Sequence, residues 1–307
     1  MKRNIPASLR QRLLNLSRTQ GRPFQEVLQF YVMERFLYRL SRSEHVDRFV
    51  LKGALMLQVW ESPQARPTMD IDMLGRTDND MNALLAQLRE VMDADAGVED
   101  GLIFHGDQLQ AEPITEDANY AGVRVRGWAE LDGARARLQV DIGFGDAVVP
   151  EPKRRLYPVL LDMPAPELLC YSRESTIAEK LQAMMSLGPL NSRMKDFYDI
   201  WLLSRQFSFE DSALLRAITA TFERRETPIP KPPLFAPSFA SEKQLQWRAF
   251  LRRLGTDVPA EPEFANVLKA LETFIGAVLD EKAAGNPGMH WLPGGPWQEL
   301  GRGHSRL

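Results

Sequence analysis

The sequence predicts an α+β fold in which a mixed sheet is flanked by helices, with a helical N-terminal segment and a helical C-terminal lobe. Short strand-like runs alternate with helical periodicity between residues 49 and 165, whereas the first 48 residues and those after about residue 166 repeat apolar side chains at helical spacing. With 307 residues, 44% of them hydrophobic, the chain is long enough for two or three packed units.

Four segments follow from these patterns. We expect a basic helical segment over residues 1–48, a core with the mixed sheet over 49–165, a helical lobe over 166–284 and a loosely ordered tail over 285–307. The tail holds six glycines and three prolines, and its two tryptophans are the residues expected to hold it in place.

Composition excludes several classes of protein. The single cysteine, Cys170, cannot form an internal disulfide framework or a multi-cysteine zinc site, and the four histidines lack metal-ligand spacing. The N-terminus leads into a charged helix rather than an apolar signal core, and no apolar run approaches the roughly 18 residues of a membrane span. We therefore expect a soluble, cytoplasmic protein without a membrane partner.

Charge is distributed unevenly along the chain. The net charge is −3, but the first 50 residues carry ten Lys or Arg against four Asp or Glu. A basic segment on an acidic body is compatible with contact to nucleic acid or to an acidic protein. It is equally compatible with the solvated face of ordinary helices.

The stretch from Arg66 to Leu74 is predicted to be a strand with two carboxylates on one face. Because side chains alternate along a strand, one face receives Met69, Ile71 and Met73, and the other receives Thr68, Asp70 and Asp72. Neighbouring carboxylates repel each other and resist burial, and a hard divalent cation such as Mg²⁺ is their commonest compensating partner. The alternative is a half-solvated edge strand that ends in a polar loop.

Two further pieces of the same region bear on this chemistry. At Lys52 and Gly53 a short strand changes into a helix, whose free N–H groups suit a phosphate, although a strand–glycine–helix turn is usually only structural. Asp141 is a lone acid on the polar face of an otherwise apolar strand. If the strand of Asp141 neighbours that of Asp70 and Asp72, three carboxylates converge, which is enough for one or two Mg²⁺ ions.

The predicted C-terminal lobe contributes two helical segments with charged residues. Lys180 follows a Thr176–Glu179 pair that fits a capping box, and either its stem packs on apolar surface or its ammonium lies beside the acidic cluster. Asp196 and Asp199 are spaced to share one helix face, where they form either ordinary salt bridges or part of a site.

The order and type of these motifs resemble those of the AbiEii/AbiGii-toxin nucleotidyltransferases, DNA-polymerase-β-like enzymes of bacterial toxin–antitoxin and phage-abortive-infection systems. The resemblance runs from about residue 49 to 203. It rests on Leu-Lys-Gly at 51–53, Arg-x-Thr-x-Asp-Ile-Asp-x-Leu-Gly at 66–75, Val-Asp-Ile-Gly at 140–143, Ala-Glu-Lys-Leu-x-Ala at 178–183 and Arg-x-Lys-Asp-x-Tyr-Asp-Ile at 193–200.

The resemblance implies a role for each matching residue. Asp70, Asp72 and Asp141 are expected to bind metal, with Asp141 helping to activate the attacking hydroxyl. The residues expected to contact nucleotide are Lys52, Gly53, Thr68, Lys180 and Lys195, with Lys180 holding the triphosphate. Asp196 and Asp199 match the helical block beside the site. Ala54 departs from the pattern, because many members have Gly, Ser or Thr there.

The expected activity is Mg²⁺-dependent transfer of a nucleoside monophosphate from an NTP to a hydroxyl, with release of pyrophosphate. In family terms the acceptor is the 3′ end of tRNA, the protein is a toxin, and its partners include a cognate antitoxin. Two alternatives remain open. One is transfer to a small molecule or a protein hydroxyl, and the other is a catalytically silent binding module whose carboxylates form structural salt bridges.

Overall fold

The structure, a computed structural model, describes residues 4–62, 68–95, 97–114, 122–254, 260–280 and 288–299. The chain divides into two compact units. The first comprises Met1–Glu61, Pro67–Gly145 and Pro152–Tyr171, and the second Ser62–Arg66, Asp146–Glu151 and Ser172–Leu307. The segment boundaries expected from the sequence at residues 48, 165 and 284 remain predictions.

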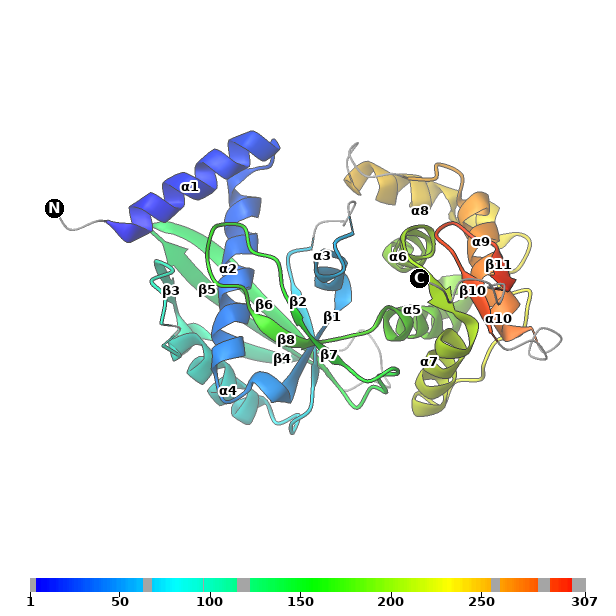
Figure 1. The fold of residues 1–307 in the computed structure, drawn as a ribbon, viewed down its shortest axis with the longest axis horizontal. Coiled ribbons are helices and arrows are strands. Elements are labelled where there is room, and N and C mark those ends of the chain that lie inside the picture. The colour runs from blue at the N-terminus through cyan, green and yellow to red at the C-terminus, as the bar shows by residue number, and fades with distance from the viewer. Residues whose placement is uncertain are drawn as a thin grey trace, which may run out of the picture. The chain divides into compact units, whose positions relative to one another are not determined.

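A mixed sheet forms the centre of the first unit (Figure 1). Its strands lie in the order β3-β5-β6-β2-β1-β8-β7, and β4 also pairs with β5. Their bounds are β1 Phe49–Lys52, β2 Ile71–Gly75, β3 Leu102–Phe104, β4 Gln110–Ile114, β5 Gly122–Leu131, β6 Ala134–Phe144, β7 Lys153–Leu156 and β8 Glu167–Cys170. The α+β class with a mixed sheet flanked by helices is thus confirmed.

Helices cover the apolar side of this sheet. They are α1 Ile5–Gln20, α2 Phe24–Arg42 and α4 Met81–Asp93, whereas the short α3 Met56–Val59 follows β1 and the turn at Gly53. Leu138, Val140 and Ile142 of β6 are buried, as the alternating pattern predicts, and so are Ile71 and Met73 of β2. One face of the sheet therefore belongs to the core, and the other carries the polar residues.

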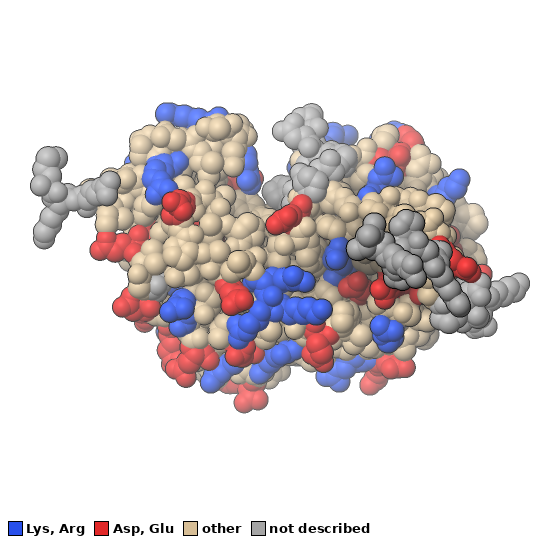
Figure 2. Space-filling model, in the orientation of Figure 1, with Lys and Arg blue, Asp and Glu red and all other residues tan. Residues whose placement is uncertain are grey.

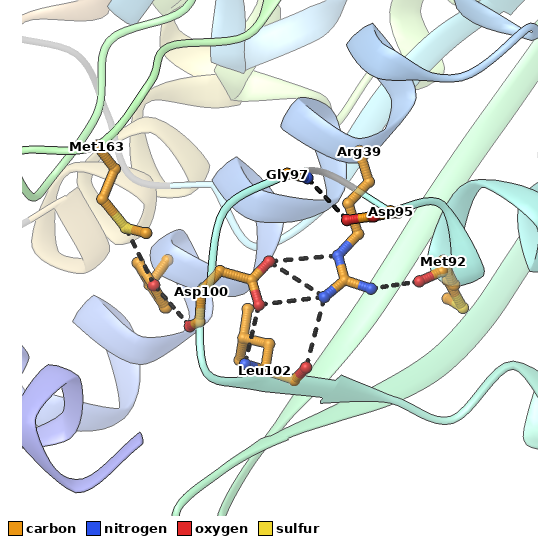
Figure 3. Close-up of polar contacts among 8 residues, drawn as sticks. Arg39, Met92, Asp95, Gly97, Asp100, Leu102 and Met163 are labelled. Atoms are coloured by element: carbon orange, nitrogen blue, oxygen red, sulfur yellow. Dashed lines mark hydrogen bonds and ion pairs between the residues drawn. The ribbon is translucent and has the colours of Figure 1, made fainter. Parts of the chain in front are cut away.

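An ion pair connects α2 to the sheet and to α4 (Figure 3). Arg39 lies 3.1 Å from a carboxylate oxygen of Asp100, which is 4% exposed, and also donates to the carbonyl of Met92 at the end of α4. Asp100 in turn accepts from the backbone N–H of Leu102 at 3.0 Å, where β3 begins. The hydroxyl of Tyr31, also on α2, donates to the carbonyl of Asp100 at 2.8 Å. These contacts fix α2 against one end of the sheet.

The opposite edge of the sheet is basic. Lys153, Arg154 and Arg155 of β7 are exposed, and Figure 2 shows Lys and Arg side chains gathered over this part of the first unit. Charged side chains on an edge strand discourage pairing with another chain. Next to β7, β8 buries Cys170, and burial raises the pKa of this thiol to about 12. The thiol is therefore protonated at neutral pH and a poor nucleophile.

The second unit is mainly helical. Its elements are α5 Arg173–Leu187, α6 Met194–Gln206, β9 Phe209–Glu210, α7 Asp211–Arg224, α8 Phe239–Leu254, α9 Phe264–Leu271 with a π-helical continuation over Glu272–Gly276, α10 Ala277–Leu279, β10 Met289–Trp291 and β11 Trp297–Glu299. Its core is aromatic. Phe197 on α6 lies 5.1 Å from Phe264 and 5.9 Å from Phe239, measured between ring centroids.

The last described residues pack by their tryptophans. Of the predicted tail, residues 288–299 form β10 and β11, which pair with each other and with β9, and the rest lies outside the described residues. The indole N–H of Trp291 donates to the carbonyl of Ser204, and that of Trp297 to the carbonyl of Phe274.

Two expectations for residues 167–179, which span the boundary between the units at residue 172, were wrong. Residues 167–170, predicted as the beginning of a helix, form strand β8, because Leu169 and Cys170 pair in parallel with β1. The next helix begins at Arg173, where the hydroxyl of Ser172 caps it by accepting from the N–H of Ser175. Thr176 therefore lies within α5 rather than at a capping box. Within the described ranges, no helix has the length and apolar character of a membrane span.

Candidate functional site

Four charged residues stand side by side across the middle of the sheet. The strand register pairs Lys52 of β1 with Asp72 of β2, Asp72 with Asp141 of β6, and Asp141 with Arg124 of β5. Residues in register on adjacent strands project from the same face. The sheet therefore brings Asp72 and Asp141, which lie 69 positions apart in the sequence, next to each other on its polar face.

Gly53 allows the backbone after β1 to approach Asp72 closely. A Cβ atom added to Gly53 would lie 1.9 Å from the Oδ2 atom of Asp72, which no side chain can tolerate. The φ angle of Gly53 is 73°, in the left-handed region that favours glycine. This glycine is thus required both by the local conformation and by the carboxylate beside it.

Asp141 is held by an arginine that the sequence motifs did not reveal. The Nε and Nη2 atoms of Arg124 donate to Oδ1 and Oδ2 of Asp141 at 2.8 and 2.7 Å, a bidentate pair. Gln139, two residues earlier on β6, also lies within 3.4 Å of Oδ2. Arg124 was missed because its role depends on the pairing of β5 with β6, which local spacing does not give. Its place in an alternating strand was the one available signal.

The first aspartate of the pair lies just before the strand. The strand was expected to include Thr68 and Asp70, but β2 begins at Ile71, and the carbonyl of Met69 accepts from the side chain of Gln29. The hydroxyl of Thr68 donates to the carbonyl of Asp70 at 3.4 Å, and Met69 is 43% exposed. Asp70 and Asp72 therefore flank Ile71 at the point where β2 begins.

Lys180, Asp196 and Asp199 form a buried charged cluster in the second unit. The ammonium of Lys180 on α5 lies 2.9 Å from Oδ1 of Asp196 and 2.8 Å from Oδ2 of Asp199, both on α6. Each aspartate side chain is only 2% exposed, and Arg193 lies 3.0 Å from the other oxygen of Asp196. The cations thus compensate two buried carboxylates.

Of the other lysines predicted to contact nucleotide, Lys52 belongs to the charged row of the first unit and Lys195 to the second unit. Lys195 is exposed on α6, and the ammonium of Lys52 lies 5.2 Å from the ring centroid of Tyr171. The expected approach of Lys180 to the carboxylates of the first unit stays a prediction.

The donor chemistry of the polar face suits a hard cation. Asp72 and Asp141 offer carboxylate oxygens there, the ligands that Mg²⁺ prefers, although both oxygens of Asp141 accept from Arg124. Asp70, just before β2, is the third carboxylate of the predicted set. Elsewhere in the first unit, Glu44, His45 and Glu90 place one ligand atom each within 4.8 Å of one another. There Nε2 of the buried His45 lies 2.6 Å from a Glu90 oxygen, so the geometry matches a histidine–glutamate pair as well as a metal site.

Much of the basic N-terminal segment is engaged in internal contacts. Arg22 pairs with Glu26 at 2.6 Å, the fully buried Arg35 lies 2.7 Å from Glu34, and Arg39 pairs with Asp100. Glu26 and Glu34 belong to the same segment, so of these three pairs only Arg39–Asp100 reduces the segment's excess of positive charge.

Comparison with known proteins identifies the family. The profile described as "Nucleotidyl transferase AbiEii toxin, Type IV TA system" matches residues 35–270. No curated protein matched the chain significantly. A crystal structure of a protein from H. pylori assigned as a nucleotidyltransferase is similar, with a TM-score of 0.50 and 15% sequence identity over 84% of this chain and 97% of that one. JHP933 from Helicobacter pylori gives a TM-score of 0.49 and 15% identity, covering 85% and 96%.

The family match spans more than half of the chain, whereas at 15% identity the structural likeness establishes the fold alone. The protein is a nucleotidyltransferase. The chain belongs to the AbiEii family of nucleotidyltransferase toxins of type IV toxin–antitoxin systems.

Proposed function

We propose that this nucleotidyltransferase transfers a nucleoside monophosphate to the 3′-terminal hydroxyl of tRNA, and that the carboxylates of Asp70, Asp72 and Asp141 carry the chemistry. The observation that supports this assignment best is the register of β2 and β6, which sets Asp72 beside Asp141. The backbone at Gly53 lies against the carboxylate of Asp72. Such an arrangement combines acidic oxygens with a close-lying backbone turn, as nucleotide transfer requires.

In the proposed reaction the acceptor oxygen attacks the α-phosphorus of the NTP. A new P–O bond forms, the bond from the α-phosphorus to the oxygen that bridges the α- and β-phosphates breaks, and pyrophosphate leaves with that oxygen. The hydroxyl proton passes to a base, a role that Asp141 can take once one of its oxygens is released from Arg124. The chain itself contributes orientation and charge.

Mg²⁺ is the cofactor that the carboxylates fit best. Asp70, Asp72 and Asp141 would hold it, and when bound it supplies charge neutralisation of the phosphates and orientation of the reacting oxygens. Lys52, Gly53 and Thr68 would contact the nucleotide from the first unit. The nucleotide contacts expected of Lys180 and Lys195 stay predictions.

The test is incubation of the purified protein with total tRNA, Mg²⁺ and each α-labelled NTP in turn. We expect label in tRNA with the wild type and its loss by about 100-fold or more with Asp72→Asn. As a matched control, Asp107→Asn removes an exposed carboxylate of the same unit and should retain activity. Transfer that Asp72→Asn leaves unchanged would refute the assignment.

The same experiment separates the alternatives. Label in a protein or in a small molecule but not in tRNA would show that this molecule, and not tRNA, is the acceptor. No label in any acceptor would favour the silent binding module. For the toxin assignment, induced expression of the wild type should arrest growth and that of Asp72→Asn should not.

A further inference from the structure

A cavity of about 560 Å³ lies in the first unit, lined by Gln108, Gln110, Arg126, Gly127, Trp128 and Arg137. The register pairs Arg126 with Gln139, two residues along the strands from the Arg124–Asp141 pair. It pairs Trp128 with Arg137, four residues along from that pair. The side chains of Arg126, Trp128 and Arg137 therefore project from the same sheet face as Asp141. The cavity belongs to the polar face but lies apart from the carboxylates.

The lining has the chemistry of a binding site for a planar anionic ligand. It presents two guanidinium groups, two carboxamides and an indole, and no carboxylate among its lining residues. Trp128 is 46% exposed although it is a large apolar side chain on a strand. Exposed aromatic rings beside arginines are the usual platform for unpaired bases, whose phosphates the guanidinium groups contact.

The two arginines differ in how far their charge is compensated. Arg126 lies 2.7 Å from a carboxylate oxygen of Glu112. Arg137 is exposed and donates to the side-chain oxygen of Gln139, and within the described part of the chain it has no carboxylate partner. Arg137 therefore supplies most of the uncompensated positive charge of the cavity.

Gln139 connects this cavity to the carboxylate row. It is 5% exposed, its oxygen accepts from Arg126 and Arg137, and its amide nitrogen lies 3.4 Å from Oδ2 of Asp141. Arg137 and Asp141 are four residues apart on one strand, which corresponds to about 13 Å. A group held in the cavity therefore lies apart from the carboxylates, yet near enough to belong to the same substrate.

We propose that this cavity binds the single-stranded end of the RNA acceptor upstream of its terminal nucleotide. Trp128 stacks on a base, Arg137 and Arg126 contact phosphates, and the two carboxamides contact base edges. The inference rests on the proposed function, because it takes RNA as the acceptor. It adds the surface by which the chain recognises that acceptor, away from the reacting carboxylates.

The experiment measures RNA binding without catalysis. Fluorescence anisotropy follows a labelled single-stranded oligoribonucleotide of about 12 nucleotides with no NTP present. We expect Trp128→Ala and Arg137→Gln each to weaken binding about 10-fold. Arg137→Gln should also lower the slope of log K against log salt by about 0.7, the value for one phosphate contact on a single strand.

Matched controls exclude general effects of charge and packing. Arg135→Gln removes a charge from the same face of β6, outside the cavity, and Ile103→Ala removes an exposed apolar side chain of β3. Both should bind RNA as the wild type does. All four altered side chains are exposed, so the urea midpoint of each variant should match that of the wild type.

Three results would overturn the proposal: wild type that binds no oligoribonucleotide, cavity variants that bind it unchanged, or variants that lose Mg²⁺–NTP binding to the same degree. The last would assign the cavity to the donor nucleotide. Specific retention of an unstructured peptide in place of RNA would assign it to a protein acceptor. Failure of the proposed function is distinguishable, because RNA binding with the expected variant effects but without nucleotide transfer would refute the reaction and leave the cavity's role intact.

Discussion

The carboxylate of Asp72 occupies the space that a side chain at position 53 would need. An ideal Cβ on Gly53 lies 1.9 Å from its Oδ2 atom and 2.6 Å from its Cγ atom. The backbone at Gly53 and the carboxylate of Asp72 are therefore in direct contact at the place where β1 ends.

Gly53→Ala should abolish nucleotide transfer and reduce stability. The added methyl group displaces Asp72 and also meets an unfavourable positive φ, which costs on the order of 1–3 kcal/mol by itself. Gly21→Ala is the matched control, because Gly21 has φ 65° but no atom within 4 Å of its added Cβ. It should lose a similar amount from the backbone alone and remain active. Equal activity of the two variants would contradict the contact. Urea unfolding and tRNA labelling measure the two effects.

Arg124→Gln should increase the affinity for Mg²⁺. Arg124 donates to both oxygens of Asp141 and so competes with a cation for the same lone pairs. Removing hydrogen bonds to a charged group worth about 1.5–3 kcal/mol corresponds to roughly tenfold tighter binding or more. Titration calorimetry of Mg²⁺ without NTP measures this. Arg126→Gln, whose ion pair is with Glu112, should change it little, and weaker binding in Arg124→Gln would contradict the competition.

Lys180→Met should destabilise the second unit strongly. The substitution removes the ammonium that lies within 2.9 Å of both Asp196 and Asp199, and breaking a buried pair typically costs about 3–5 kcal/mol. The triple variant Lys180→Met, Asp196→Asn and Asp199→Asn removes the uncompensated charges and should recover part of the loss. A Lys180→Met protein with wild-type unfolding would show that this lysine has no structural role. Activity of this variant is therefore measured together with its urea unfolding, so that loss of folding is distinguished from loss of catalysis.

Glu34 should make the stability of the first unit depend on pH. Burial raises its pKa from 4.5 to about 7, while the neighbouring Arg35 opposes the shift. The native state then holds a proton that the unfolded chain releases, so this stabilisation is complete below pH 4.5 and is lost as the pH rises through 7. Between pH 4.5 and pH 7 the free energy of unfolding should fall less in Glu34→Gln than in the wild type. The difference between the two proteins should be about 3 kcal/mol at most. Glu99→Gln, an exposed control, should keep the wild-type dependence.

Local patterns predicted much of the sheet but not all of its edges. β6 was predictable because Leu138, Val140 and Ile142 alternate with polar residues, and β2 because Ile71 and Met73 do so. β8 was missed, since a short apolar run such as Leu168 to Cys170 has no period that separates strand from helix. Its parallel pairing with β1 decides the outcome, and that contact is not local.

The candidate site shows the same division. The sequence pointed to each carboxylate by residue type, and β-strand register accounts for the adjacency of Asp72 and Asp141. Arg124 and the cavity around Trp128 were beyond reach, because both depend on which residues of β5 face which residues of β6. Which side chains are neighbours across two strands depends on the register of the strands, and the spacing of residues along one strand does not give that register.

Strand β2 pairs antiparallel with β1 on one side and parallel with β6 on the other. Its amides are thus enclosed by main-chain partners in both directions, and we expect them among the slowest of the chain to exchange with deuterated water. The position of Asp72 is then fixed by the hydrogen bonds of the sheet, and no loop has to become ordered first. Asp72→Asn should remove the charge of this side chain and leave the strand in place. A loss of nucleotide transfer in this variant can then be attributed to the missing carboxylate rather than to misfolding.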